Sequence, residues 1–537
     1  MKILMAYSNL PLMMAPAISV GIFHAMCKDE GVEFKLFETT EYSEEYKNRH
    51  IVMSRAGANR GIAKDTRDDD YFTIKDPDRV IPDFIETVEN FEPDLILVHM
   101  QEDVVQMGLD LLESIKDKNI PHITGGVYAM AAPDMLIKEP AVNVVCRYEG
   151  EEVLRQAIQA FKNNQDFTSI DGIWWKDANG SVIKNKPAKL TDITKAIPDF
   201  TCYENKRWAR PMGGRYFQRA ISLETYRGCP YKCSYCNSPG TRQLATQLDL
   251  GNFMRRKSAD IIERDLHSFI DKGVDPDMAM FIDDSFLARP AKEIFEFTDM
   301  WSKYKIPFWF NTRIENCKPE YLAALKEAGA YRMTFGIESG NEEYRKTVLK
   351  RAVTNDKYRE YFGYINDSDI PYSLNVIIGM PFETRAMVMD TARLVRDARG
   401  HDGLTLAIWQ PYRGTELRDV AIQEGFIEPD HNTPGTGYLD WEQDAGIKMP
   451  KPYLQRDEMT TLVKVFALYA YFPDDMWPLI KQAETDEKLR DELMNKYKSE
   501  FFGSKYQEGG KTKLAQLNRY CNKHDESASY QFIECRP

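Results

Sequence analysis

The sequence predicts an α/β protein in which two parallel β-sheets follow one another along the chain and a mainly helical region comes last. Two observations lead to this prediction. Short apolar runs alternate with helical patterns in residues 1–165 and again in residues 216–435, as expected for parallel strands joined by crossover helices. Residues 436–537 show amphipathic helical patterns instead, and residues 166–215 are expected to form a linker with a short hairpin at Asn179-Gly180.

The composition indicates a globular protein of two or three domains. Of its 537 residues, 43% are hydrophobic and 12% are aromatic, which is enough for substantial cores. No apolar stretch is long enough to span a membrane, and the N-terminus lacks the layout of a signal peptide. Nine cysteines, an odd number, argue against a disulfide framework, so we expect a cytoplasmic protein. The net charge of −13 disfavours nucleic acid as a partner.

In residues 1–165 the pattern indicates a doubly wound parallel sheet. Ligands of such sheets bind beyond the carboxyl ends of the strands. The expected strands are Ile3–Tyr7, Glu33–Glu38, Asp94–His99, His122–Thr124 and Asn143–Arg147. The expected helices lie near Ala17–Lys28, Ile81–Asn90, Val104–Lys118 and Glu151–Lys162. The segments placed to face a ligand are Asn9–Pro16, Met100–Val104, Gly125–Tyr128 and Tyr148–Glu151.

In residues 216–435 we expect a partial (β/α)6 barrel, with its site at the carboxyl ends of the strands. The expected strands are Ala220–Tyr226, Met278–Ile282, Pro307–Phe310, Arg332–Gly336, Ser373–Ile378 and Leu404–Trp409. The expected helices are Ala259–Lys272, Ala291–Lys303, Pro319–Ala328, Lys357–Asn366 and Met387–Arg399.

Three cysteines in the spacing CxxxCxxC follow the first of these expected strands. Cys229, Cys233 and Cys236 can each bind one iron of a [4Fe–4S] cluster and leave the fourth iron open, as a catalytic metal requires. The alternatives are a zinc site or cysteines without a metal. Structural zinc takes four ligands, usually from two CxxC pairs, and the sequence contains no second pair.

This cysteine loop resembles the signature of the radical S-adenosylmethionine (radical SAM) superfamily, and the resemblance extends over about residues 215–420. It implies that the open iron binds the amino and carboxylate groups of SAM. It also implies that an electron from the cluster cleaves SAM to a 5′-deoxyadenosyl radical. By the same resemblance, SAM is expected to contact the aromatic residue before the third cysteine and groups at later strand ends, namely Tyr235, Asp283, Glu338, Ser339, Ile378 and Gly379.

Residues 1–165, directly upstream, resemble a cobalamin-binding domain. The motifs are Gly125-Gly126 after the fourth expected strand, and Tyr148-Glu149-Gly150-Glu151 after the fifth, where the family has Gly-Glu-Gly-Glu. The resemblance implies a cobalamin site formed by Gly125, Gly126, Tyr148, Glu149, Gly150 and the loop Met100, Gln101, Glu102, Asp103 and Val104. The lower face of the corrin is expected around Met100, Gln101 and Glu102.

The DxHxxG motif, which supplies a histidine to cobalt in other cobalamin proteins, is absent. Cobalamin is therefore expected to bind without a protein histidine on cobalt, and His24 and His99 are expected to be packed or capping histidines. The alternative for this region is a flavodoxin-like domain that has no cofactor and only docks against the barrel.

Together, the resemblances imply a cobalamin-dependent radical SAM methyltransferase. One SAM methylates cob(I)alamin, and a second yields the radical that abstracts hydrogen from an unactivated carbon, which then takes the methyl group. The alternatives are a radical SAM cyclase, a ring-contracting or oxidising enzyme with the same cofactors, a cobalamin-free radical SAM enzyme, or an iron–sulfur protein without enzymatic activity. The expected partners are a small-molecule or peptide substrate and a reductase or flavodoxin-type electron donor.

Overall fold

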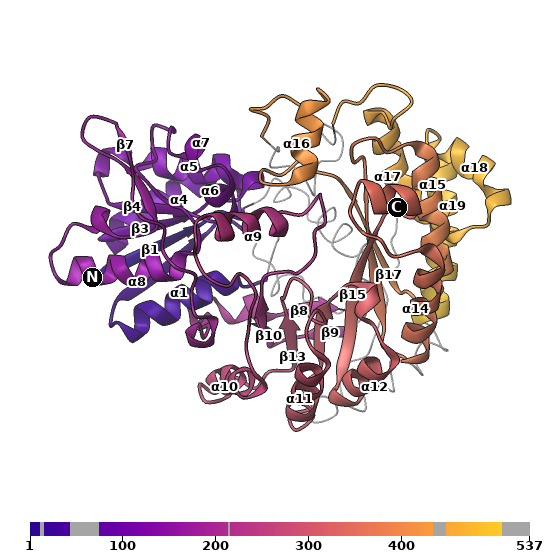
Figure 1. Ribbon diagram of the computed structural model, residues 1–537, viewed down its shortest axis with the longest axis horizontal. Coiled ribbons are helices and arrows are strands. Elements are labelled where there is room, and N and C mark those ends of the chain that lie inside the picture. Colours follow the sequence, from indigo (N-terminus) through magenta and orange to yellow (C-terminus); the bar gives the residue numbers. More distant parts are fainter. Residues whose placement is uncertain (11–14, 43–74, 213–214, 433–446, 507–537) are drawn as a thin grey trace.

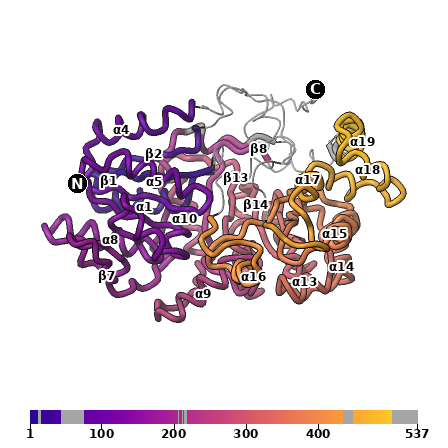
Figure 2. The backbone as a smooth tube through the Cα atoms, turned by 90° about the horizontal axis from the view of Figure 1, so that it is seen from above, coloured from indigo at the N-terminus to yellow at the C-terminus, as the bar shows by residue number. Residues whose placement is uncertain are grey.

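The computed structural model describes residues 1–10, 15–42, 75–212, 215–432 and 447–506. Two parallel sheets lie beside one another, and the helices of the C-terminal region cover the far side of the second sheet (Figure 1). A view at right angles shows the same order from the N-terminal sheet to the C-terminal helices (Figure 2). The predicted α/β class is confirmed.

The first sheet has seven strands in the order β2-β1-β3-β4-β5-β6-β7. Strands β1 to β5 are parallel, whereas β6 and β7 form an antiparallel hairpin that extends the sheet at one edge. The chain forms β2 on one side of β1 and then crosses over to form β3 on the other side, so the strand order reverses at β1. Doubly wound sheets bind their ligands at such a point, beyond the carboxyl ends of the strands. The strands are β1 Lys2–Tyr7, β2 Glu33–Glu38, β3 Leu95–His99, β4 His122–Gly125, β5 Val144–Cys146, β6 Ile173–Lys176 and β7 Val182–Lys184.

Helices cover both faces of this sheet, as the apolar strands require. Ile3 and Met5 of β1 pack in one core with α1 and α8, whereas Leu4 and Ala6 pack in another with α4 and α5. The alternation follows from the two-residue period of a strand. Figure 1 shows α1 and α8 on one side of β1 and β3 and α4 and α5 on the other. The helices are α1 Ile18–Asp29, α4 Val80–Phe91, α5 Val105–Ser114, α6 Val127–Ala131, α7 Pro133–Leu136 and α8 Gly150–Lys162.

The second sheet has six parallel strands in the order β10-β13-β14-β15-β16-β17. Its helices lie along the outside, and a cluster of aromatic rings from Phe281, Phe286, Phe297, Trp301 and Phe308 packs α11 against β13 and β14. The strands are β10 Ala220–Leu223, β13 Met278–Phe281, β14 Phe308–Asn311, β15 Ala330–Glu338, β16 Tyr372–Ile378 and β17 Gly403–Ile408. The helices between them are α9 Ser238–Gln247, α10 Ala259–Ile270, α11 Ala291–Trp301, α12 Pro319–Ala328, α13 Glu342–Thr347, α14 Asn355–Asp367 and α15 Arg385–Asp397.

The expected strand that leads to the cysteine loop is shortened most in the structure. The strand expected over Ala220–Tyr226 ends at Leu223, because the backbone amides of Thr225 and Tyr226 turn to the Asp283 carboxylate. A separate two-residue strand, β11 (Tyr226–Arg227), then pairs with β12 (Arg255–Arg256).

The C-terminal helices pack against the second sheet near its carboxyl edge. Helix α17 lies against α15, and the Met459 side chain of α17 would be overlapped by a Cβ atom at Gly379, at the end of β16. Among the described residues, no helix is both long and apolar enough to cross a membrane. The helices of this region are α16 Glu416–Gln423, α17 Arg456–Tyr471, α18 Trp477–Ala483 and α19 Glu487–Tyr506, and residues 507–537 lie outside the described part of the chain.

Candidate active site

The three cysteines lie on one loop between β11 and α9, beyond the end of β10. Gly228, just before the first cysteine, has a φ of 98°, and a Cβ atom there would lie 2.7 Å from the carbonyl oxygen of Phe253. Only glycine tolerates both the left-handed backbone and this close approach. The loop is also held from the other side, because Arg242 of α9 donates to the carbonyl of Pro230 at 2.9 Å.

Two of the three sulfur atoms accept hydrogen bonds. Arg313 Nη1 lies 3.4 Å from Cys233 Sγ, and the Ser238 amide lies 3.5 Å from Cys236 Sγ. Burial raises the pKa of Cys229 to about 11 and that of Cys236 to about 12, so both are thiols at neutral pH when no metal is bound. Binding to iron as thiolates would release these protons, and the two donors would stabilise the resulting charge.

The donor set fits a cluster better than a zinc ion. Among the residues that the structure describes, no three His, Cys, Asp or Glu side chains converge as they would on one ion. A cubane takes each thiolate on a different iron, so its ligands lie farther apart than those of a single ion. The loop provides three cysteines and no fourth ligand within the motif, which is the donor set of a cluster with one open iron.

Asp283 and Asp284 follow β13 at the same edge of the sheet but have different environments. Asp283 is buried, and its Oδ1 accepts the Thr225 and Tyr226 amides at 2.7 and 2.9 Å, while Oδ2 pairs with Arg289 at 3.0 Å. The Asp283 carboxylate, which was predicted to contact SAM, therefore already has protein partners. Asp284 is exposed, and dense surroundings together with Asp283 raise its pKa to about 6.

Glu338, at the end of β15, is buried with one carboxylate oxygen unused. Its Oε1 accepts from the Tyr235 hydroxyl at 3.2 Å and from Arg351 at 3.3 Å, but its Oε2 has no hydrogen-bond partner. Glu338 has a φ of 63°, and a Cβ atom at Gly336 would overlap its carboxylate. A strained buried acceptor at a strand end is typical of a ligand site, and vicinal hydroxyls of a ribose would satisfy the free oxygen.

The other predicted SAM contacts are backbone positions. Ser339 and Ile378 are fully buried, and Ser339 accepts the Asn341 amide at 3.4 Å. Gly379, with a φ of 81°, donates its amide to Oε2 of the Glu383 carboxyl group at 2.6 Å. This contact fixes the turn after β16 at the same edge as the cysteine loop, where an adenine ring could rest on backbone atoms.

Glu383 gives this turn a dependence on pH. The side chain is fully buried, and burial raises its pKa from 4.5 to about 8, so the folded protein holds it protonated at neutral pH. Its stabilising contribution is complete below the unfolded pKa and is lost as the pH rises through about 8.

Glu383→Gln tests this pH dependence, because glutamine does not titrate. When the pH is raised from about 6 to about 9, we expect the free energy of unfolding to fall by on the order of 1–3 kcal/mol more in the unchanged protein than in Glu383→Gln. Unfolding midpoints at the two pH values test this, with Glu360→Gln at a solvent-exposed site as the control; parallel pH profiles would contradict it.

At the first sheet, the predicted cobalamin residues line the carboxyl ends of β3, β4 and β5. Gly126 has a φ of 110°, and a Cβ atom there would lie 2.6 Å from the Met100 carbonyl oxygen. Val127, the next residue, is 43% exposed, which is unusual for a valine at the edge of a packed sheet. An apolar surface beside a glycine turn suits the flat, largely apolar face of a corrin, so these residues fit the group.

The loop after β3 makes direct contacts with the second sheet. Asp103 accepts from the Tyr412 hydroxyl at 2.9 Å, and Glu102 accepts the Arg413 amide at 2.8 Å. Glu102 also lies 3.6 Å from Arg418. Burial raises the pKa of Asp103, and both carboxylates are buried. Of the predicted lower-face residues, Met100 and Val104 are buried too, and Gln101 donates to Asp103 at 3.1 Å.

The segment after β5 joins the first sheet to the cysteine loop. Glu149 pairs with Arg227 at 3.3 Å and with Arg255, and Arg227 also pairs with Glu151 at 2.7 Å. The Tyr148 hydroxyl donates to the Thr241 carbonyl of α9 at 2.8 Å. A Cβ atom at Gly150 would lie 2.6 Å from the Phe23 ring, so this glycine serves helix packing. Arg227 stands two residues before Cys229, and the two sheets therefore present their carboxyl edges to one another.

Sequence reasoning missed the arginines of these sites. The partners of Glu338, Cys233, Asp283 and Glu149 are Arg351, Arg313, Arg289, Arg227 and Arg255. A single arginine forms no recognisable sequence motif. Each of these arginines pairs with a residue that is distant in the chain or lies across a turn. The only signal in the sequence was that buried carboxylates need cationic partners.

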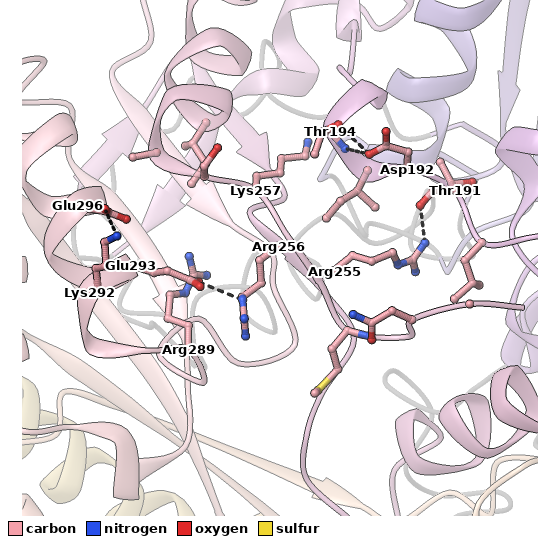
Figure 3. A pocket seen from close by; sticks show the side chains of 18 of the residues that line it. Thr191, Asp192, Thr194, Arg255, Arg256, Lys257, Arg289, Lys292, Glu293 and Glu296 are labelled. Atoms are coloured by element: carbon pink, nitrogen blue, oxygen red, sulfur yellow. Dashed lines mark hydrogen bonds and ion pairs between the residues drawn. The ribbon is translucent and has the colours of Figure 1, made fainter.

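A cavity of about 680 Å³ lies beside the base of the cysteine loop, between the linker and helices α10 and α11 (Figure 3). None of the predicted site residues lines it. Four of its charged side chains form two ion pairs, Arg256 with Glu293 at 3.0 Å and Lys292 with Glu296 at 3.5 Å, while Arg255 and Arg289 pair with residues outside the cavity. We therefore do not assign the cavity as the substrate site.

Residues 223–395 match the family described as the radical SAM superfamily. They include the cysteine loop and the strand ends from β13 to β16. This part of the chain is thus similar to the domain that defines the radical SAM superfamily.

Curated relatives cover most of the chain at low identity. An uncharacterized methyltransferase of Pyrococcus horikoshii is 24% identical over 367 residues, which are 65% of this chain and 74% of that protein. Cytidylyl-2-hydroxyethylphosphonate methyltransferase of Streptomyces wedmorensis is 23% identical over 394 residues, or 65% of this chain and 70% of that protein. Anaerobic magnesium-protoporphyrin IX monomethyl ester cyclase of Cereibacter sphaeroides is 22% identical over 344 residues, or 61% and 51% of the two chains.

Solved structures extend the likeness to nearly the whole chain. OxsB, a cobalamin-dependent SAM radical enzyme with aqua-cobalamin and SAM bound, matches with a TM-score of 0.62 and 14% identity, over 96% of this chain and 75% of that one. The radical SAM methyltransferase TsrM of Kitasatospora setae, with cobalamin and a [4Fe–4S] cluster bound, matches with a TM-score of 0.59 and 14% identity, over 92% and 98% of the two chains. Both sheets of this protein thus have the fold of cobalamin-dependent radical SAM enzymes.

Proposed function

We propose that this protein is a cobalamin-dependent radical SAM methyltransferase that adds a methyl group to an unactivated carbon of a small molecule or peptide. The proposal rests mainly on the ion pairs that connect the carboxyl edge of the first sheet with the cysteine loop of the second. Arg227, two residues before Cys229, pairs with Glu149 and Glu151 at the carboxyl end of β5. These ion pairs hold the cysteine loop against the segment that follows β5, and this contact supports a site in which two cofactors act in succession.

The side chains of this protein would bind the cluster, orient SAM and balance the charge of the cluster thiolates. Cys229, Cys233 and Cys236 would hold the cluster, and Arg313 would donate to a cluster thiolate. Glu338, kept in place by Arg351, would accept the ribose hydroxyls of SAM. When bound, the cluster supplies the electron that cleaves SAM, and cobalamin carries the methyl group. A flavodoxin-type or reductase donor would supply electrons from outside.

The cobalamin residues of the first sheet would act mainly through the backbone and apolar contacts. Gly125, Gly126 and Val127 would face the corrin, and the loop from Met100 to Val104 would lie beneath it. Glu149 has another role here, since its carboxylate is paired with Arg227 and Arg255. Its expected contact with cobalamin would then come from the backbone.

A second candidate is a radical cyclisation or oxidation with the same cofactors. The similarity to magnesium-protoporphyrin monomethyl ester cyclases favours this candidate. The two candidates differ in one product, because S-adenosylhomocysteine forms only when SAM donates its methyl group.

The test begins with protein purified without oxygen and reconstituted with iron, sulfide and hydroxocobalamin. After desalting, the proposal requires about four irons and near one corrinoid per chain. With a strong reductant and candidate substrates, 5′-deoxyadenosine and S-adenosylhomocysteine should then form in equal amounts with methylated product. Deoxyadenosine without S-adenosylhomocysteine would favour cyclisation, and loss of the corrinoid on desalting would favour cobalamin-free chemistry.

A further inference from the structure

We propose that Arg313 raises the reduction potential of the iron–sulfur cluster by donating a charged hydrogen bond to one of its thiolate ligands. The inference rests on the proposed function, because it requires that the three cysteines bind the cluster. Arg313 follows the end of β14 by two residues, so it comes from a different part of the barrel than the cysteine loop. Its Nη1 lies 3.4 Å from Cys233 Sγ. This sulfur is the atom that would bind iron.

Two further contacts hold the guanidinium of Arg313 in this position. Its Cζ lies 3.9 Å from the centroid of the Tyr231 ring, which belongs to the cysteine loop. Its Nη2 pairs with Glu315 at 2.5 Å. The Tyr231 hydroxyl in turn donates to Asn316 Oδ1 at 2.8 Å. The turn after β14 and the cysteine loop are therefore joined at several points, and the donor is oriented before any cluster binds.

The hydrogen bond from Arg313 to the sulfur lies in a buried environment. The Arg313 side chain is 11% exposed, and Cys233 is buried. Water and salt screen such a contact much less than a pair of charges at the surface. In the described part of the chain, Arg313 is the one charged side chain that donates to a sulfur of the cysteine loop. Glu315 lowers the net charge of this unit, but the N–H group directed at the sulfur remains.

Arg242 shows how an arginine supports the backbone of the same loop. It donates to the carbonyls of Cys229 and Pro230, at 3.4 and 2.9 Å. Arg313 instead directs Nη1 at a sulfur, and its buried Nε has no hydrogen-bond partner among the described residues. Arg313 thus acts on a metal ligand, whereas Arg242 acts on the backbone.

The effect of this contact on reduction follows from charge. Reduction takes [4Fe–4S]²⁺ to [4Fe–4S]⁺ with one electron from the flavodoxin-type or reductase donor, and no proton or leaving group is involved. The added electron increases the negative charge on the cluster and its thiolates. A charged N–H donor at one thiolate therefore stabilises the reduced form more than the oxidised form. Arg313 makes the cluster easier to reduce for the external donor.

The test is a redox titration of the full-length protein, reconstituted without oxygen and kept free of SAM, with the reduced cluster measured by electron paramagnetic resonance. For Arg313→Gln, we expect the ratio of reduced to oxidised cluster at a fixed potential to fall about tenfold, a downward shift of about 59 mV. Glu315→Gln should shift the midpoint upward, because it removes the negative charge beside the guanidinium. Lys232→Gln is the control, since Lys232 precedes Cys233 but is exposed to solvent. It should keep the midpoint of the unchanged protein.

Each outcome bears on the inference. An unchanged midpoint in Arg313→Gln would overturn it, and so would an equal downward shift in Lys232→Gln, which would indicate a general effect of nearby charge. If Arg313→Gln failed to hold about four irons, Glu315→Gln would decide, since only an upward shift agrees with the inference. None of these results affects the proposed methyl transfer. Failure of the unchanged protein to take up a cluster would instead contradict the proposed function itself.

Discussion

Replacing Cys236 by alanine is expected to remove the iron–sulfur cluster and with it the formation of 5′-deoxyadenosine. The loop provides three cysteines and no fourth ligand, so a missing thiolate cannot be compensated from within the motif. Iron content after anaerobic reconstitution should fall from about four per chain to below about one. Deoxyadenosine, measured with SAM and a strong reductant, should fall to the level of a control without enzyme.

Cys202→Ala is the matched control for this loss. Cys202 lies on the linker, and within the described part of the chain its sulfur has one hydrogen bond, a long one of 4.0 Å to the Asp199 carbonyl. This variant should retain iron and SAM cleavage. If Cys236→Ala kept a full complement of iron and cleaved SAM, the assignment of the cysteine loop would be wrong.

Asp283→Ala is expected to be the most destabilising single change near the site. It removes a buried carboxylate that holds two backbone amides and would leave Arg289 buried without its partner. Breaking a buried ion pair in this way typically costs about 3–5 kcal/mol. The thermal unfolding midpoint, followed by circular dichroism without oxygen, should fall clearly, and cluster loading should fall with it because the strand that leads to the cysteine loop is released.

Asp284→Ala, at the neighbouring residue, is the matched control for the loss of stability expected in Asp283→Ala. Asp284 is exposed and is repelled by Asp283, which contributes to its raised pKa of about 6. Its removal should leave the unfolding midpoint within about 0.5 kcal/mol of the unchanged protein, or slightly above it. Equal losses of stability in the two variants would show that Asp283 is not the structural member of the pair.

The two sheets could be predicted because their strands carry strong local signals. Apolar runs such as Leu95–His99 and Ser373–Ile378 are separated by amphipathic helices. This pattern is typical of parallel strands, because helices cover both faces of a parallel sheet and each strand is then apolar along its whole length. The spacing of the three cysteines likewise predicts an iron–sulfur cluster from a segment of eight residues, Cys229 to Cys236. Both signals are contained in short segments, so a single sequence is enough to detect them.

The polar connections could not be predicted, because each depends on tertiary contacts. Asp283 was expected to face SAM, but its carboxylate caps the amides of Thr225 and Tyr226, 58 and 57 residues earlier in the chain. Glu149 was expected to contact cobalamin, yet it pairs with Arg255, 106 residues later. Periodicity places a side chain at a strand end without specifying which neighbour it meets. The contacts of the predicted SAM and cobalamin residues with their ligands remain predictions.

The loop after β3 has a consequence for how such proteins can be recombined. Glu102 and Asp103 are buried, and their partners Arg413, Arg418 and Tyr412 all belong to the segment that follows β17. If the first sheet were exchanged for one that lacks these carboxylates, Arg418 would lose its contact with Glu102, and Tyr412 would lose its hydrogen bond to Asp103. The two parts of this chain therefore cannot be shuffled as independent modules. A working chimera would need the segment from Tyr412 to Arg418 to be transplanted together with the N-terminal sheet, although more than 300 residues separate them.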